Sequence, residues 1–224
     1  MINGETHHFE FIGLYDGVSI LRDRETGGYW HHITGQCLYG PLAGARLAGL
    51  SNLLHLSVDQ ALNVYDHLEI AVSDRPIRGT PSRWWPLAES VPALPDRLRN
   101  TMAGEDTRRS TMDVGLGVWN QRIQRYYPME SIAASDDYVI DEFDGRRLLV
   151  YFDPAGHALS ALYTRATSAE WRDKDLVLDT GEFIHGGVLH DPQGSRLVTE
   201  RPMQLFTRWY GYALTFPTTE IFTP

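Results

Sequence analysis

The sequence has one cysteine, no long apolar run and no excess of basic residues. A lone Cys37 excludes an internal disulfide and any multi-cysteine zinc or iron–sulfur site. No segment approaches the roughly 20 apolar residues of a membrane-spanning helix, so we expect no integral membrane protein. The net charge of −9 argues against nucleic acid or an anionic membrane as partner, because phosphate groups are bound by clustered Lys and Arg.

Recognisable signals are also few. The opening MINGETHHFEF lacks the basic and apolar regions of a secretory signal, which predicts a cytoplasmic protein. The glycine-rich pieces match neither a phosphate-binding loop nor a dinucleotide fingerprint, and neither G-x-S-x-G nor H-E-x-x-H occurs. We therefore expect neither nucleotide hydrolysis nor a zinc protease of that type.

Dense turn signals separate short apolar segments over most of the 224 residues. Asp16-Gly17 and Asp144-Gly145 each lie between apolar runs, which is a strong signal for a β-hairpin. The pattern predicts a mainly β fold of antiparallel strands. The expected strands cover residues 9–15, 17–22, 28–33, 113–119, 122–127, 138–143, 146–152, 158–164, 176–179, 183–186 and 219–222.

Helix signals are sparse. Ser57 and Gln60 form a capping-box pattern that predicts a helix over 58–67. Pro95 and Gly104 frame a second expected helix over 95–103. Thr207 is the predicted cap of a third helix, which ends before Pro217.

The segment 73–111 differs in composition, because it holds five of the twelve prolines and seven arginines. It is either a connector between two halves or an anion-binding lid. Trp84 and Trp85 are costly to expose to water, so part of it should dock on the rest of the chain.

A weak internal repeat joins TGQCLYGPLAGARLAGL (34–50) and TGEFIHGGVLHDPQGSRLVTE (180–200). We expect a truncated first repeat over 1–72, the connector over 73–111 and a second repeat over 112–224. These would pack as one pseudo-symmetric domain, with a site in the cleft between the repeats.

Several motifs resemble those of a large prokaryotic family, domain-of-unknown-function family 3179. They are DRETGGYW (23–30) followed by TGQCLYGPLAGARL, DTRRSTMDVGLGVWNQRIQRYYPM (106–129) and VIDEFDGRRLLVYFDP (139–154). The resemblance implies a fold and a repeat but no reaction.

Two departures from the family pattern bear on chemistry. Where many members read C-P-x-C-G-S, this chain reads FDPAGH (152–157), and their H-E-V-V-N-D stretch is here DDYVID (136–141). Any chemistry of a cysteine pair is therefore lost.

Histidines and the cysteine are the first candidate ligands. His31, His32 and Cys37 are close in sequence, and imidazole and thiolate suit a divalent transition metal. Neighbours on a strand point to opposite faces, so a partner from the second repeat is needed, and His185 is the expected one. The alternative is one buried and one exposed histidine. Cys37 could also be a nucleophile, although lone cysteines are commonly buried and inert.

Asp141, Asp153 and His157 form a second candidate set. Hairpin pairing could bring the strand that holds Asp141 beside the strand that approaches Asp153, and a carboxylate beside a histidine orients a general base. Alternatively, Asp153 bonds the backbone of its own turn.

Arginines beside aromatic residues are candidate ligand contacts. Arg125 with Tyr127, and Arg208 with Trp209, could hold an anionic group and stack on a flat ligand, or form the rim of a core.

Two functions fit these residues. The first is a small-molecule enzyme of bacterial metabolism, working with or without the assistance of a metal ion. The second is a non-catalytic module for a small ligand or a partner chain, and a structural subunit is a third option. A pocket in which histidine and carboxylate converge would favour the enzyme, whereas a flat aromatic surface would favour partner binding.

Overall fold

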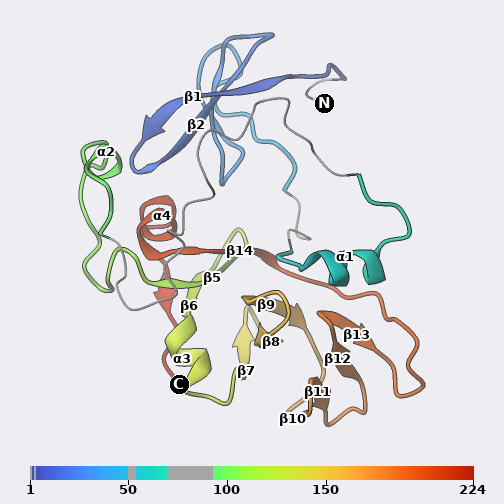
Figure 1. Ribbon diagram of the computed structural model, residues 1–224. Helices are drawn as coiled ribbons and strands as arrows, with labels where there is room; N and C mark the ends of the chain where they lie inside the picture. The colour runs from blue at the N-terminus through green and yellow to red at the C-terminus, as the bar shows by residue number, and fades with distance from the viewer. Residues whose placement is uncertain (1, 3, 50–53, 70–92) are drawn as a thin grey trace, which may run out of the picture.

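The computed structural model describes residues 2, 4–49, 54–69 and 93–224 of the chain (Figure 1). Strands make up 39% of these described residues and helices 12%, which confirms the expected mainly β class. No helix in the described ranges is long and apolar enough to cross a membrane. Residues 73–92 of the Pro/Arg-rich segment, with Trp84 and Trp85, lie outside the description.

The N-terminal strands form an antiparallel meander in the order β1-β2-β3-β4, drawn in blue at the top of Figure 1. Asp16 and Gly17 both have positive φ and make the predicted hairpin turn. The backbone N–H of Gly17 donates to the Thr101 hydroxyl, and the backbone N–H of Ala103 donates to the Asp16 carboxylate. These two bonds fix the turn against the segment after α2. The strands are β1 (Phe9–Tyr15), β2 (Val18–Asp23), β3 (Tyr29–His31) and β4 (Cys37–Tyr39).

The remaining strands form three further sheets. Their orders are β14-β5-β6-β15, β7-β8-β9 and β10-β11-β12-β13, and all neighbours are antiparallel except β15 and β6. The strands of the first two sheets are β5 (Val114–Trp119), β6 (Gln124–Pro128), β7 (Tyr138–Phe143), β8 (Arg146–Asp153), β9 (Ala158–Tyr163), β14 (Met203–Arg208) and β15 (Glu220–Ile221). The strands of the third are β10 (Ala169–Arg172), β11 (Asp175–Leu178), β12 (Phe183–His185) and β13 (Val188–His190).

The core lies between these three sheets. One buried cluster joins Tyr127, Ile132 and Leu148, and a second joins Leu149 with Leu176 and neighbouring side chains of the β10–β13 sheet. Strand β8 contributes to both, because its successive side chains point to opposite faces and both faces are covered. It therefore provides the rigid base on which the pocket described below is built.

The helices are short. Helix α1 (Val58–Val64) begins with the predicted capping box of Ser57 and Gln60, which the structure confirms. Helix α2 (Asp96–Arg99) is shorter than the expected 95–103. Two further helices are α3 (Met129–Ala133), which was not predicted, and α4 (Trp209–Thr215).

The predicted cap of the last helix is wrong. Thr207 lies in β14, which pairs with β5, and Arg208 is the N-cap without a side-chain bond. Strand pairing overrides the local capping signal there, since a complete ladder satisfies more backbone groups than one hydroxyl.

The two proposed repeat segments share a local feature. Gly35 and Gly181 both have positive φ in turns that follow β3 and β11. The two sheets that contain these turns have the same meander order. However, the Gly35 turn leads into β4, the last strand of its sheet, whereas the Gly181 turn leads into β12, the third strand of its sheet. The pseudo-symmetric repeat therefore stays a prediction.

Candidate functional site

A pocket of about 350 Å³ opens where the end of β8 meets the β10–β13 sheet. Apolar and aromatic walls surround a few polar groups there, which is the usual make-up of a small-molecule site. The lining residues are Tyr151, Asp153, Pro154, Ala155, Trp171, Lys174, Ile184, His185, Gly186 and Gly187. Asp153 and His185, two of the residues expected from the sequence, thus share one pocket.

Asp153 anchors the pocket wall. It is 5% exposed and accepts hydrogen bonds from Gln60 Nε2 at 2.6 Å and from the backbone N–H of Ala155 and Gly156. The two backbone bonds are the turn pattern that sequence reasoning held open as the alternative. The bond from Gln60 ties α1 to β8 across 93 residues.

Two glycines allow the chain to close around this carboxylate. A Cβ on Gly187 would lie 2.9 Å from Asp153 Oδ2, and one on Gly156 would lie 2.6 Å from the carbonyl oxygen of His55. Gly187 also has φ +79°, a conformation that favours glycine. The β12–β13 turn therefore packs directly on the Asp153–Gln60 pair.

His185 forms a close pair with Asp175 on the neighbouring strand. Leu176 of β11 faces Ile184 of β12, so the next positions along the two strands, Asp175 and His185, also face each other. The Nδ1 atom of His185 lies 2.6 Å from Asp175 Oδ1. With Nδ1 held by the carboxylate, Nε2 is left as the basic atom of the ring, and no described polar atom bonds it.

Lys174 and Trp171 complete the pocket. Lys174 is the only lysine of the chain and lies in the turn between β10 and β11, next to Asp173, whose φ is +56°. The Trp171 Nε1–H donates to the carbonyl oxygen of Asp136 at 2.9 Å, which fixes the ring. Sequence reasoning missed Lys174, Trp171 and Asp175; the uniqueness of the lysine was a signal that could have been used.

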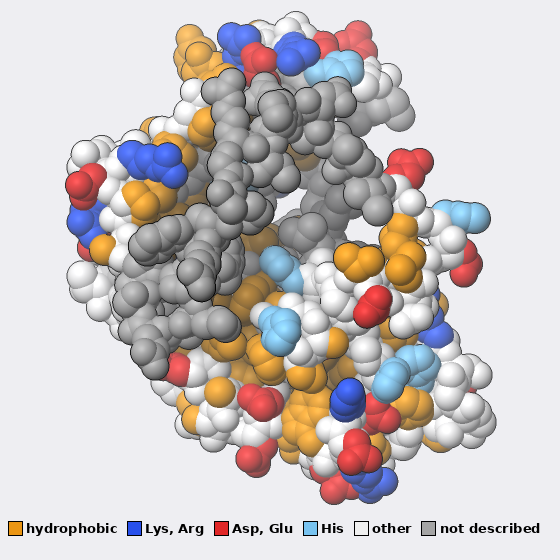
Figure 2. Space-filling model, in the orientation of Figure 1, with side chains coloured by type: hydrophobic (Ala, Val, Ile, Leu, Met, Phe, Trp, Pro, Cys, Tyr) orange, Lys and Arg blue, Asp and Glu red, His pale blue; other side chains and the backbone are white. Residues whose placement is uncertain are grey.

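Figure 2 shows histidine side chains at the centre of the visible face, to the left of α1, and at the lower right, where Figure 1 places the β12–β13 hairpin. Exposed hydrophobic side chains lie between them. The region of the pocket thus combines ionisable and apolar groups at the surface.

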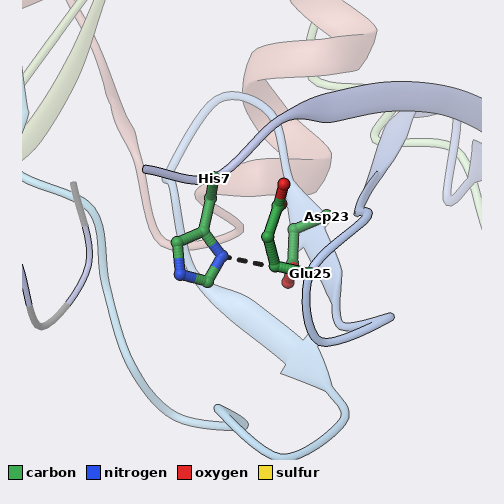
Figure 3. Close-up of side chains that lie close together, drawn as sticks. All are labelled: His7, Asp23 and Glu25. Carbon is green, nitrogen blue, oxygen red and sulfur yellow. Dashed lines mark hydrogen bonds and ion pairs between the residues drawn. The ribbon is translucent and has the colours of Figure 1, made fainter. Parts of the chain in front are cut away.

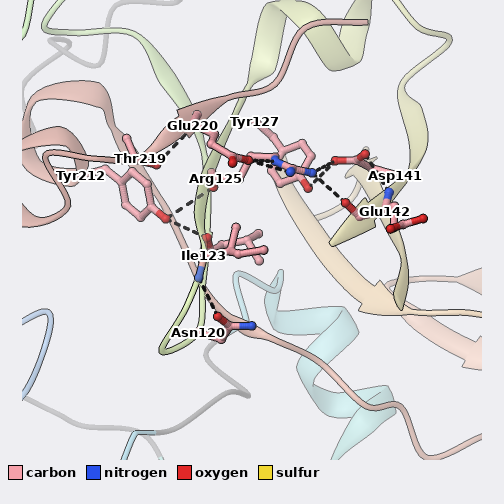
Figure 4. A network of polar contacts seen from close by, with 10 residues as sticks. Asn120, Ile123, Arg125, Tyr127, Asp141, Glu142, Tyr212, Thr219 and Glu220 are labelled. Carbon is pink, nitrogen blue, oxygen red and sulfur yellow. Dashed lines mark hydrogen bonds and ion pairs between the residues drawn. The ribbon is translucent and has the colours of Figure 1, made fainter. Parts of the chain in front are cut away.

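Asp141 lies in a different place. Its Oδ2 accepts bonds from Arg125 Nη1 at 2.5 Å and from the Tyr127 hydroxyl at 2.8 Å (Figure 4). Arg125 also bonds Glu220 Oε2 through Nε and Nη2. The sequence did not indicate that Arg125, Tyr127 and Asp141 meet.

The charges within this network satisfy one another. Burial alone lowers the pKa of Arg125, but hydrogen bonds to Glu220 and Asp141 outweigh it and raise that pKa. Burial, together with the negative charge of Asp141, raises the pKa of Tyr127. The guanidinium is occupied by carboxylates of its own chain, and the network holds β15 against β6 and β7.

The expected constellation of Asp141, Asp153 and His157 is not formed. Strands β7 and β8 do pair, but the register places Asp141 opposite Leu148, five residues before Asp153. At about 3.3 Å per residue this separates the two carboxylates by roughly 16 Å. His157 follows the Asp153 turn with φ +50°.

The other expected metal ligands lie apart. His31, His32 and Cys37 belong to the β1–β4 sheet, whereas His185 belongs to β12 in another sheet. Within the described ranges, three ligand atoms of this set do not come within 4.8 Å of one another. The rings of His31 and His32 stack at 6.0 Å, and His32 Nδ1 bonds the carbonyl oxygen of Ser19.

The protonation of these groups follows from their burial. Burial and the neighbouring His32 lower the pKa of His31 to about 4. Burial raises the pKa of the Cys37 thiol, whose sulfur donates to the carbonyl oxygen of Tyr39. A raised pKa is the opposite of what a nucleophilic cysteine needs.

Arg208 and Trp209 serve the core. Trp209 is fully buried and its Nε1–H donates to the carbonyl oxygen of Asp106. Arg208 Nη1 donates to the carbonyl oxygen of Met112. The expected contact of Trp209 with a ligand has no exposed ring face to form on.

A cluster that sequence reasoning missed lies at the end of β2. Ligand atoms of His7, Asp23 and Glu25 all lie within 4.8 Å of one another, which makes them a possible metal-ligand cluster (Figure 3). Asp23 and Glu25 are two positions apart, but His7 lies 16 positions before Asp23, so no short spacing connects it to them in the sequence.

Comparison with family models, curated proteins and solved structures found no match. The resemblance to domain-of-unknown-function family 3179 therefore stays a prediction, and function is argued from the site alone.

Proposed function

We propose that this protein is an enzyme that binds a small polar ring compound in the Asp153–His185 pocket, where His185 acts as a general base. The observation that carries the proposal is the 2.6 Å contact between Asp175 and the Nδ1 atom of His185, which lines the pocket together with Trp171 and Lys174. A carboxylate on Nδ1 sets the tautomer and leaves Nε2 to accept a proton.

The remaining side chains indicate the class of ligand. Trp171 offers an aromatic surface, Lys174 a hydrogen-bond donor and Asp153 an acceptor, a combination that suits a ring carrying hydroxyl or amino groups. About 350 Å³ accommodates one or two rings.

A partner-binding module is the alternative, and the exposed aromatics of the β1–β4 sheet are its basis. Tyr29 faces Tyr39 across β3 and β4, whereas Phe11 faces Leu21, which in turn faces Trp30, the residue after Tyr29. Since successive residues of a strand alternate, the tyrosines and Phe11 lie on opposite faces. They do not form one flat aromatic surface, which favours the pocket.

The single lysine permits a direct test. Reductive ¹³C-methylation of the full chain retains the charge and labels Lys174 and the α-amino group. Each methyl signal is assigned by comparison with Lys174→Arg. Monosaccharides, nucleosides and amino acids are then added one at a time. A ligand of the pocket should shift the Lys174 signal in the wild type and not in Trp171→Ala.

Tyr39→Ala is the matched control, because it removes an exposed ring in another sheet. It should leave the shifts unchanged. If no compound in these classes moves the Lys174 signal, or if Trp171→Ala responds like the wild type, the proposed pocket is wrong. Turnover of a hit that His185→Asn abolishes, with binding retained, would support the general base. Equal turnover would refute it.

A further inference from the structure

The β2–β3 turn holds a buried carboxylate beside a buried imidazole. Asp23 at the end of β2 is fully buried, and the side chain of His7, from the segment before β1, is 3% exposed. The backbone N–H of Arg24 donates to the carbonyl oxygen of His8, which docks this segment on the turn. Glu25 extends from the same turn toward the other two residues (Figure 3).

We propose that His7, Asp23 and Glu25 bind a divalent transition metal, with zinc as the ion that fits best. The site is independent of the Asp153–His185 pocket and shares no residue with the metal ligands expected from the sequence.

The first argument is the distance between His7 Nδ1 and Asp23 Oδ1, which is 3.3 Å. That is longer than the usual N–H···O hydrogen bond of about 2.9–3.0 Å. Two ligand atoms bound at about 2.0 Å to one tetrahedral zinc ion lie about 3.3 Å apart. The separation therefore matches two neighbouring ligands of zinc.

The second argument is the support behind each carboxylate. Thr26 donates to Asp23 through its N–H and its hydroxyl, both at 2.6 Å, and Trp30 Nε1–H donates at 2.8 Å. His8 bonds both oxygens of Glu25. Outer hydrogen bonds of this kind orient metal-binding carboxylates.

The donor set selects the ion. One imidazole nitrogen and two carboxylate oxygens suit zinc, manganese or ferrous iron better than cuprous copper. Three protein ligands also leave a fourth tetrahedral position for water. Cys37 is not part of the set, because its sulfur bonds the carbonyl oxygen of Tyr39.

The test uses the full chain, stripped with a chelator and titrated calorimetrically with zinc chloride. The wild type should bind one zinc ion, and His7→Ala and Glu25→Gln should each weaken binding at least tenfold. Glu25 is partly exposed and Glu25→Gln keeps its shape, so this variant should fold. His185→Ala, which removes the histidine of the pocket, should bind like the wild type.

Cobalt provides an independent reading of the ligands. Cobalt-loaded protein should show the visible absorption of a tetrahedral nitrogen–oxygen site without a sulfur-to-metal charge-transfer band. A wild type that binds no zinc at 100 µM (about −5.5 kcal/mol or weaker), variants that bind as tightly as the wild type, or a sulfur band would each overturn the proposal.

Discussion

Adjacent glycines in the β12–β13 turn allow the packing of this turn to be measured. Gly186 and Gly187 both have positive φ, at +56° and +79°. A Cβ on Gly186 would meet nothing within 4 Å, whereas a Cβ on Gly187 would lie 2.9 Å from Asp153 Oδ2 and 3.2 Å from Gln60 Nε2. Alanine at the two positions therefore imposes a similar backbone penalty but a different steric one.

The magnitudes follow from these two contributions. A left-handed alanine costs about 1–2 kcal/mol, which is the whole expected loss for Gly186→Ala. Gly187→Ala adds overpacking against the buried pair, which costs about 1–3 kcal/mol. Its free energy of unfolding should therefore fall by about 2–5 kcal/mol.

The free energies of unfolding are obtained from urea titrations followed by tryptophan fluorescence and far-UV circular dichroism. An Asp153→Ala background removes the shortest of these contacts and leaves the one to Gln60, so the extra cost of Gly187→Ala over Gly186→Ala should become smaller. Equal losses for the two single variants, or an unchanged difference in the Asp153→Ala background, would refute this packing.

Three further outcomes follow from the structure. The pKa of His31 is about 4 in the folded protein and 6.5 in the unfolded chain, so the unfolded chain binds more protons between these values. The free energy of unfolding should therefore decrease as the pH is lowered from 6.5 to 4. Urea titrations of His31→Gln should show a shallower decrease, and an unaltered slope would contradict this role of His31. Cys37 should react with Ellman's reagent far more slowly in the native protein than in urea, because the thiol is buried and its pKa raised; equal rates would show an accessible thiolate. Tyr127→Phe should lower the free energy of unfolding by about 1.5–3 kcal/mol, because a buried bond to the Asp141 carboxylate is lost, whereas Tyr163→Phe, with no bond from its hydroxyl among the described residues, should change it by less than about 0.5 kcal/mol; similar losses would exclude this role.

Local signals explain which parts of the fold could be predicted. The Asp16-Gly17 and Asp144-Gly145 turns and the capping box at Ser57 depend on a few neighbouring residues, and each forms as expected. Strand β14 could not be found in this way. Its residues bond β5, about 90 positions earlier in the chain, and this long-range ladder decides its conformation.

The candidate site shows the same limit. Asp153 and His185 were chosen from the sequence and lie in one pocket, yet the sequence paired them with Asp141 and Cys37, which lie elsewhere. Register determines such partnerships, and register is set by side chains on the paired strands rather than by spacing along one of them. Asp175 therefore became visible as the partner of His185 only through the pairing of β11 with β12.

Asp23 and Asp153, which are buried, and Asp141, which is partly buried, differ in how their charge is balanced. Asp141 is neutralised by the guanidinium of Arg125. Among the described residues, Asp153 accepts bonds from an amide and two backbone N–H groups, all of them neutral donors. Asp23 has neutral donors from Thr26 and Trp30 and a long contact to His7. Since a buried charge is stabilised by an opposite charge or by further donors, the ligand that we propose should place hydroxyl or amino groups beside Asp153, and the metal that we propose should place a positive charge beside Asp23.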